Sequence, residues 1–119
     1  MNNPDLPYRQ ALECLSQKQY NFTEVRRLLT EAASAGHPAA AFELAKHLMD
    51  ADSPYQDREQ GMKMLRIAAE QEHPYACYNL AYIQELEGAP PETLIPLYRP
   101  PAEAGVPEAQ VRLMYLLYA

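Results

Sequence analysis

The sequence predicts an all-α fold, an α-solenoid of about three and a half antiparallel helix pairs. Three observations indicate this fold. An alanine-rich segment recurs three times at nearly equal spacing, and each copy contains a turn followed by a proline. The sequence also lacks the alternating runs of Val, Ile or Thr that are typical of strands. A length of 119 residues fits one domain, which we assign to residues 1–119.

The three copies align on their prolines, Pro38, Pro74 and Pro107, which are 36 and then 33 residues apart. An alanine and a leucine keep fixed offsets from each proline: Ala40, Ala76 and Ala109, and Leu44, Leu80 and Leu113. These offsets place the alanine and the leucine one helical turn apart, so we expect both to point inward. Repeat units of this length bury their apolar faces against one another, which predicts stacked helix pairs.

Each turn between paired helices has its own residue pattern. Gly36 and Gly105 are expected to adopt the left-handed conformation that ends a helix, and the following proline suits the first turn of the next helix. Glu72 takes the place of glycine in the second copy, which predicts backbone strain there. His37 and His73 hold equivalent positions, and we interpret them as caps or turn residues because the repeat keeps them apart.

Seven helices are expected, over residues 5–18, 22–35, 38–50, 57–71, 74–86, 91–104 and 107–118. The first is a capping helix, and the others form repeats over 22–50, 57–86 and 91–118. Asn21 with Glu24, and Asp57 with Gln60, are candidate capping boxes. Pro96, Pro100 and Pro101 fall inside the sixth helix, so a kink or break is expected near residues 98–101, either as a hinge or as irregular packing.

The three copies resemble the Sel-one-like repeat family, a branch of the tetratricopeptide-like α-solenoids. The resemblance rests on Ala32–Ala40, Ala68–Ala76 and Ala102–Ala109 and covers residues 22–119. It implies a right-handed solenoid that serves in scaffolding and protein–protein recognition, often in bacterial regulation, without shared chemistry. The family often has glycine after the leucine of the first helix, where this chain has Ala45, Ala81 and Met114.

In such a solenoid the first helix of each pair tends to line the concave face. Helical spacing predicts nine partner-binding residues on this concave face: Glu43, Lys46, Asp50, Tyr75, Asn79, Tyr82, Glu108, Arg112 and Tyr115. Amide, cationic and aromatic side chains suit an extended peptide. The alternative is a solvated face on which the tyrosines pack against the adjacent repeat.

The last helix is apolar on two sides. One stripe, Ala109, Leu113, Leu116 and Leu117, is expected to pack on the preceding helices, and a second stripe consists of Val111, Met114, Tyr115 and Tyr118. Terminal repeats normally have a polar outer face. The first helix fits that rule, with Tyr8, Leu12 and Leu15 expected inside. We therefore expect the second stripe to bind another chain, most simply in a homodimer. The alternative is a monomer in which this helix folds back or frays.

Charge and cysteine content exclude several classes of protein. The net charge is −6, and residues 68–119 alone carry −5, which disfavours nucleic-acid binding. This acidic half is either a solvated surface or a face that attracts a basic partner electrostatically. No apolar run approaches the roughly 18 residues of a membrane span, and the first residues lack a secretory pattern. Cys14 and Cys77 form no disulfide framework, so a cytoplasmic location is expected.

No catalytic or phosphate-binding motif occurs in the sequence. His47 has Glu43 and Asp50 within one helical turn, a spacing that suits a metal in principle, but we interpret it as part of a polar face. The sequence therefore predicts a non-enzyme without metal or cofactor, a module that binds a partner protein or peptide, possibly a basic one. The alternatives are a homo-oligomeric building block, or an inhibitor or accessory subunit of one dedicated partner.

Overall fold

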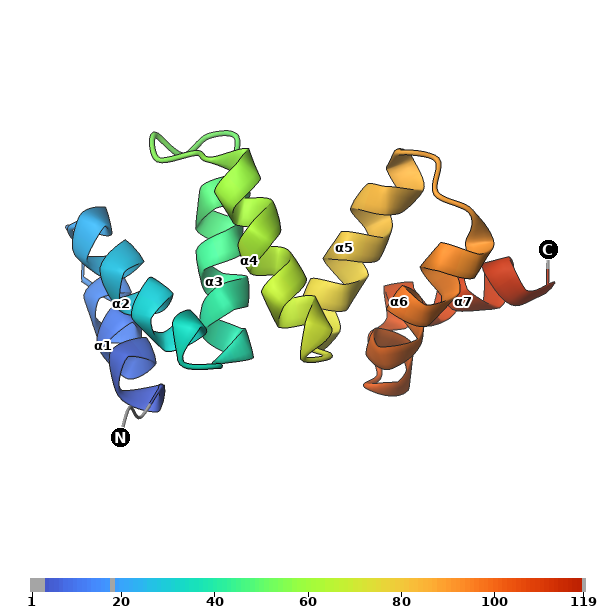
Figure 1. The fold of residues 1–119 in the computed structure, drawn as a ribbon, viewed down its shortest axis with the longest axis horizontal. Coiled ribbons are helices and arrows are strands. Elements are labelled where there is room, and N and C mark those ends of the chain that lie inside the picture. Colours follow the sequence, from blue (N-terminus) through green and yellow to red (C-terminus); the bar gives the residue numbers. More distant parts are fainter. Residues whose placement is uncertain (1–3, 18, 119) are drawn as a thin grey trace. The chain divides into compact units, whose positions relative to one another are not determined.

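A computed structural model describes residues 4–17 and 19–118 of the chain. This described part contains seven α-helices and no strand, so the all-α prediction is confirmed (Figure 1). The helices are α1 (Asp5–Leu15), α2 (Phe22–Ser34), α3 (Pro38–Met49), α4 (Arg58–Glu70), α5 (Pro74–Leu86), α6 (Pro91–Glu103) and α7 (Pro107–Tyr118). The first helix is shorter than expected and ends at Leu15, and position 18 of its expected range lies outside the described residues.

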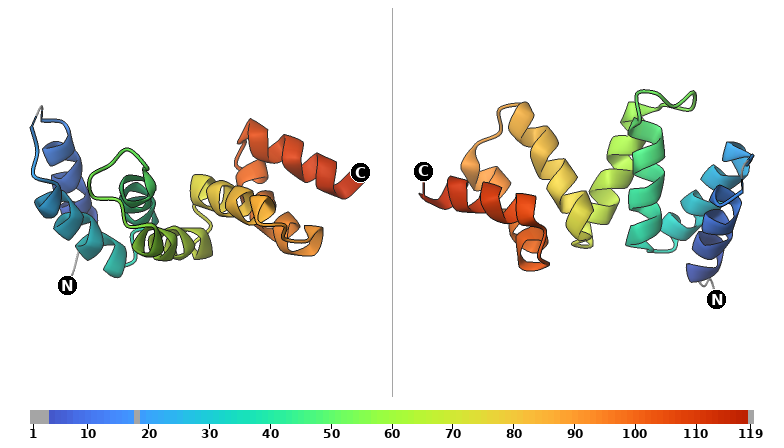
Figure 2. Two further views of the ribbon diagram at one scale, coloured as in Figure 1. Left: turned by 90° about the horizontal axis from the view of Figure 1, so that it is seen from above. Right: turned by 180° about the vertical axis from the view of Figure 1, so that it is seen from behind.

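The helices fall into two compact units, residues 1–67 and 68–119. In the first unit α1 packs on α2 and α2 packs on α3, and the views of Figures 1 and 2 agree on this order. Helix α2 lies against both of its neighbours and buries a broad apolar face, because its apolar residues recur every three or four positions. Its buried side chains are Phe22, Val25, Leu28, Leu29, Ala32 and Ala33, and they are joined by Leu44 and Leu48 of α3.

The second unit contains α5, α6 and α7, in which α6 packs on both of its neighbours. Its core is one cluster of buried side chains: Ala81, Leu94, Tyr98, Val106 and Ala109. Tyr98 is fully buried at the centre of α6, and its ring lies 6.0 Å from the ring of Tyr78 on α5. Small alanines on α5 and α7 allow the large side chains of α6 to approach both helices closely.

The turns follow the repeat pattern. Gly36 and Gly105 have positive φ values of 96° and 94°, as expected, and Glu72 is the one non-glycine residue of the described chain in that region, at 59°. His37 and His73 are confirmed as N-terminal caps. Each Nδ1 accepts a hydrogen bond from a backbone N–H three residues on, at 3.1 Å for His37 and 3.2 Å for His73. Equivalent residues thus cap equivalent helices.

The two candidate capping boxes form in part. Asn21 accepts a hydrogen bond from the N–H of Thr23, and Asp57 accepts one from the N–H of Gln60. The carboxylate of Glu24 does not complete its box, because it binds the guanidinium of Arg27 one turn along the exposed face of α2. In both helices the side chain of the N-cap residue therefore forms its half of the motif.

Two sequence predictions differ from the structure. The expected break in α6 is absent, because burial of Leu94, Tyr98 and Pro101 holds the helix against its neighbours despite the missing N–H donors. In α1 the buried residues are Pro7 and Ala11, whereas Leu12 was expected inside and is exposed. A small alanine permits close contact with α2, which turns the larger leucine outward.

Candidate functional site

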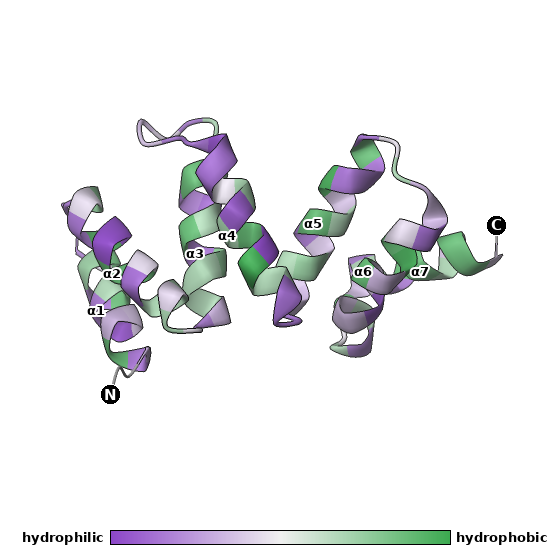
Figure 3. Cartoon of the chain, in the orientation of Figure 1, coloured by the Kyte–Doolittle hydropathy of each residue, from purple (hydrophilic) through white to green (hydrophobic). Residues whose placement is uncertain are grey.

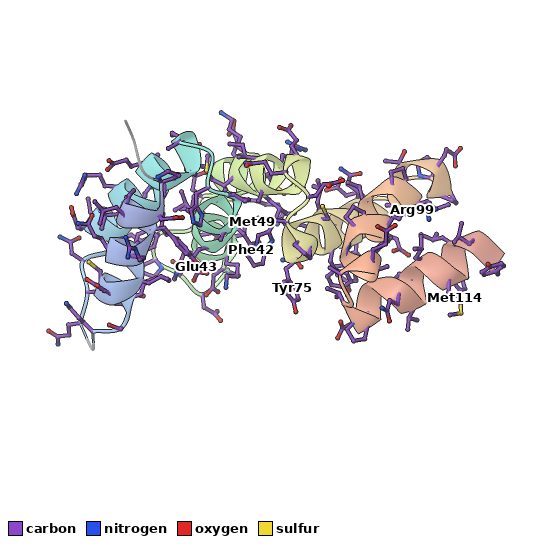
Figure 4. All side chains as sticks on the ribbon, turned by 90° about the horizontal axis from the view of Figure 1, so that it is seen from below. Phe42, Glu43, Met49, Tyr75, Arg99 and Met114 are labelled. Carbon is purple, nitrogen blue, oxygen red and sulfur yellow. The ribbon has the colours of Figure 1, made fainter. Side chains whose placement is uncertain are left out.

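An exposed apolar face on α7 is the most distinctive surface of the chain. Val111, Met114, Tyr115 and Tyr118, which we call the α7 apolar face, have exposed fractions of 64%, 60%, 60% and 83%. They line a shallow hollow of about 420 Å³. The hydrophobic colour of the last turns of α7 is visible in Figure 3, and in Figure 4 the Met114 side chain projects away from α6. The second stripe predicted from the sequence is therefore solvent-exposed.

The opposite stripe of α7 packs only in part. Ala109 is fully buried, and Leu113 and Leu116 are half-buried against the core cluster of α5 and α6. Leu117 was assigned to this stripe but is 44% exposed. At 100° per residue Leu117 lies between the two stripes, so it extends the exposed apolar surface instead.

Polar contacts fix the orientation of α7 against its neighbours. The Arg112 guanidinium forms an ion pair with the carboxylate of Glu85 on α5, and its Nε lies 3.3 Å from Glu85 Oε1. The Tyr98 hydroxyl donates to the same oxygen at 2.6 Å. The amide of Gln110 donates to the Ala102 carbonyl at 3.0 Å. These bonds hold the α7 apolar face on the outer side of the second unit.

Burial also changes the acidity of this network. Burial, with smaller contributions from the nearby Tyr78 and Tyr82, raises the pKa of Tyr98 to about 12. The Tyr98 hydroxyl therefore keeps its proton over the physiological range and acts as a donor to Glu85. It is a structural group and has no access to a substrate, because the side chain is fully buried.

The predicted concave-face residues of α3 are held by local contacts. Lys46 Nζ lies 3.1 Å from a carboxylate oxygen of Glu43 and 5.1 Å from the centre of the Phe42 ring. A hydrogen bond with His47, assisted by Lys46, lowers the pKa of Glu43 below its usual range. Asp50 Oδ1 accepts from the N–H of Asp52, so this carboxylate shapes the loop after α3.

The other predicted concave-face residues lie on α5 and α7. Tyr75 and Tyr82 are about half exposed, and the Tyr82 ring stacks 6.4 Å from that of Tyr78. Asn79 is half-buried and Glu108 is exposed. Arg112 is bound to Glu85 and lies 5.3 Å from the Tyr115 ring, so its charge is already compensated within the chain. On these two helices the exposed aromatic rings therefore offer more to a partner than the charges.

Sequence reasoning missed a second hollow in this unit. It has a volume of about 550 Å³ and is lined by Glu72, Pro74, Ile95, Pro96, Arg99, Pro100, Glu103 and Ala104. Two of the internal prolines of α6, Pro96 and Pro100, form part of its wall. The lining includes one guanidinium, that of Arg99, and two carboxylates, those of Glu72 and Glu103, so the hollow has mixed charge and no selective electrostatic character.

The described residues contain no cluster of three His, Cys, Asp or Glu side chains able to hold a metal ion. Cys14 and Cys77 are free thiols, and burial raises the pKa of Cys77, which donates to the Ala69 carbonyl at 3.4 Å. Within the same described residues, no helix is long and apolar enough to cross a membrane.

Comparison with known proteins identifies a bacterial relative. All 119 residues of the chain are 94% identical to the "Uncharacterized protein NMB1327" of Neisseria meningitidis serogroup B. The chain spans about a quarter of the length of this relative, 26%. No protein-family description and no solved structure matches the chain.

Proposed function

We propose that this chain is a non-catalytic protein–protein interaction module, an adaptor or scaffold of the Sel-one-like repeat kind. The observation that carries the proposal is the α7 apolar face, which places four large apolar side chains in solvent on one helix. Contiguous apolar surface of this sort is typical of binding sites for other proteins. A bacterial cytoplasmic setting belongs to the same proposal, and a Neisseria relative and two free thiols support it.

The repeated local structure supports a right-handed solenoid. The caps His37 and His73 and the turns at Gly36, Glu72 and Gly105 recur at the positions that the three copies share. Solenoids of this kind use rows of exposed side chains on successive helices to bind extended partners. In this proposal the concave-face residues of α3, α5 and α7 act together with the α7 apolar face.

The test compares capture of partner proteins by three immobilised forms of the chain. The wild type, Met114→Asp with Tyr118→Ser, and the matched control Tyr20→Ser are incubated with bacterial extract, and bound proteins are quantified by mass spectrometry. Tyr20 is 44% exposed and lies outside the proposed surfaces. We expect the paired variant to lose at least one bound protein that the control retains. A fourth form, Tyr75→Ser with Tyr82→Ser, tests the concave face.

An identical set of bound proteins for all four forms, each with wild-type helical content, would contradict the proposal. The homo-oligomeric alternative is tested by light scattering over a range of concentrations. A dimer that Met114→Asp converts to a monomer supports a structural building block instead. The accessory-subunit alternative is favoured by the charge of −5 on residues 68–119, and it predicts capture of one basic protein that weakens steeply with added salt.

A further inference from the structure

We propose that the α7 apolar face is the docking site of an amphipathic helix with the chemistry of α4, the helix that follows α3. This inference rests on the proposed interaction function and names the kind of partner that the face takes. It follows from what lies against the equivalent face of α5 and α3, the two earlier helices that begin at an aligned proline.

On α5 three of the four equivalent residues contact the next helix, while Tyr82, which corresponds to Tyr115, is 48% exposed. The shared offset from Pro74 and Pro107 pairs Val111 with Tyr78, Met114 with Ala81, and Tyr118 with Glu85. All three α5 residues contact α6. Ala81 is fully buried in the cluster that contains Leu94 and Tyr98, the Tyr78 ring lies 6.0 Å from the Tyr98 ring, and Glu85 accepts from the Tyr98 hydroxyl.

On α3 the C-terminal end of the equivalent face lies against α4. Met49 and Leu48 correspond to Tyr118 and Leu117, and both approach Gly61 of α4 so closely that a Cβ there would overlap Met49 Cγ. The backbone N–H of Asp57 donates to the Leu48 carbonyl at 2.8 Å, which brings the connecting loop back onto the end of α3. The corresponding carbonyl on α7 is that of Leu117.

The chemistry of the occupant follows from these two precedents. Helix α4 buries one narrow stripe, Gly61, Met64, Leu65 and Ala68. Its exposed charges are three basic residues, Arg58, Lys63 and Arg66, and two acidic residues, Glu59 and Glu70, so its net charge is positive. Helix α6 instead exposes two acidic residues, Glu92 and Glu103, and one basic residue, Arg99, so its net charge is negative. Residues 68–119 have a charge of −5, so a helix with a basic outer side complements this part of the chain better.

A second copy of the chain is the less favoured occupant. The α7 apolar face offers on the order of 600 Å² of side-chain surface, so two copies would bury about 1,200 Å² in total, the lower limit for a specific interface. The Neisseria relative has about three quarters of its length outside the matched segment, so its polypeptide is long enough to include further segments of this size.

The experiment extends the full chain with its own helix. In the repeat register Ala119 corresponds to Asp50, so a copy of residues 51–71 is appended directly after Ala119. The matched control carries the same extension with Met64→Ser and Leu65→Ser in the appended copy only, which keeps its length and charge. Hydrogen exchange of the amides of α7 and the thermal midpoint are measured for the extended chain, the control and the wild type.

We expect exchange of the α7 amides at least tenfold slower, and a thermal midpoint several degrees higher, in the extended chain alone. Met114→Asp in the extended chain should abolish both effects. As a second measurement, a synthetic peptide of residues 51–71 is titrated into the isotope-labelled wild type. Chemical-shift changes confined to residues 111–118, absent with the Ser-substituted peptide, support the proposal.

An extension that leaves α7 exchange unchanged, together with a peptide that shifts no α7 signal, would overturn the inference. Exchange protection in the wild type that rises with its concentration and persists in the extended chain would also overturn it, in favour of a second copy. Neither result contradicts the proposed function if the partner-capture experiment still distinguishes the surface variants from Tyr20→Ser.

Discussion

The hydroxyl of Tyr98 provides a direct test of how the second unit is held together. Substitution of Tyr98 by Phe keeps the buried ring and removes only the oxygen that donates to Glu85 at 2.6 Å. A hydrogen bond to a charged group contributes about 1.5–3 kcal/mol. Glu85 retains its ion pair with Arg112, so we expect a loss near the lower end, about 1.5–2 kcal/mol.

The free energy of unfolding is measured by urea titration followed by far-UV circular dichroism at pH 7. For a domain of this size the expected loss lowers the thermal midpoint by roughly 6–8 °C. Tyr82→Phe is the matched control, since Tyr82 is 48% exposed and lies in the same unit. We expect that control to stay within about 0.5 kcal/mol of the wild type.

A double-mutant cycle with Glu85→Gln isolates the contribution of the pair. The two single variants should be non-additive, because each removes the same charge-assisted bond. Equal stability of Tyr98→Phe and the wild type, within about 0.3 kcal/mol, would refute the role assigned to this hydroxyl.

The pKa of Tyr98 gives a second readout of the same group. It is raised from 10.0 to about 12, so the folded chain retains a proton that the unfolded chain releases. The stabilisation is therefore complete below pH 10 and declines as the pH rises from 10 toward 12. Tyr98→Phe should lack this part of the alkaline decline.

Three further predictions concern the turns, a helix contact and acid stability. Glu72→Gly relieves a positive φ of 59° and should raise the free energy of unfolding by about 1 kcal/mol in urea titrations, whereas Gly105→Ala, at φ 94°, should lower it by a similar amount. A stability decrease for Glu72→Gly contradicts the strain argument. Gly61→Ala adds a methyl group that overlaps Met49 and lies 3.3 Å from Leu48 Cβ. Calorimetry should show that the free energy of unfolding falls by about 1 kcal/mol, despite the higher helix propensity of alanine. Glu59→Ala, at an exposed position of the same helix, serves as the control. Glu43 has a lowered pKa, so its contribution is present above its ordinary value of 4.5 and is lost as the pH falls through the lower folded value. Glu43→Gln should cost about 0.5–1 kcal/mol at pH 7 and nothing at pH 2, and an equal difference at both values rules out this assignment.

Local sequence patterns account for the helices, their turns and their caps. Each of these features depends on neighbouring residues. Proline begins α3, α5 and α7, and a left-handed residue ends the helix before each of them. His37 and His73 cap the two helices that they precede. The alternating stripes of α7 also follow from 3.6 residues per turn, which is why its outer stripe was correctly expected to be apolar.

Helix packing, in contrast, sets which apolar residues are covered and which charges are paired. Helical periodicity gives the direction of a side chain but not the neighbour that meets it. Leu12 and Leu117 therefore lie exposed where burial was expected, and α6 continues through three prolines because its neighbours hold it. Arg112 was predicted to bind a partner, whereas its charge is bound to Glu85, 27 residues earlier in the chain. Contacts at such separations depend on how helices pack, which local sequence pattern does not specify.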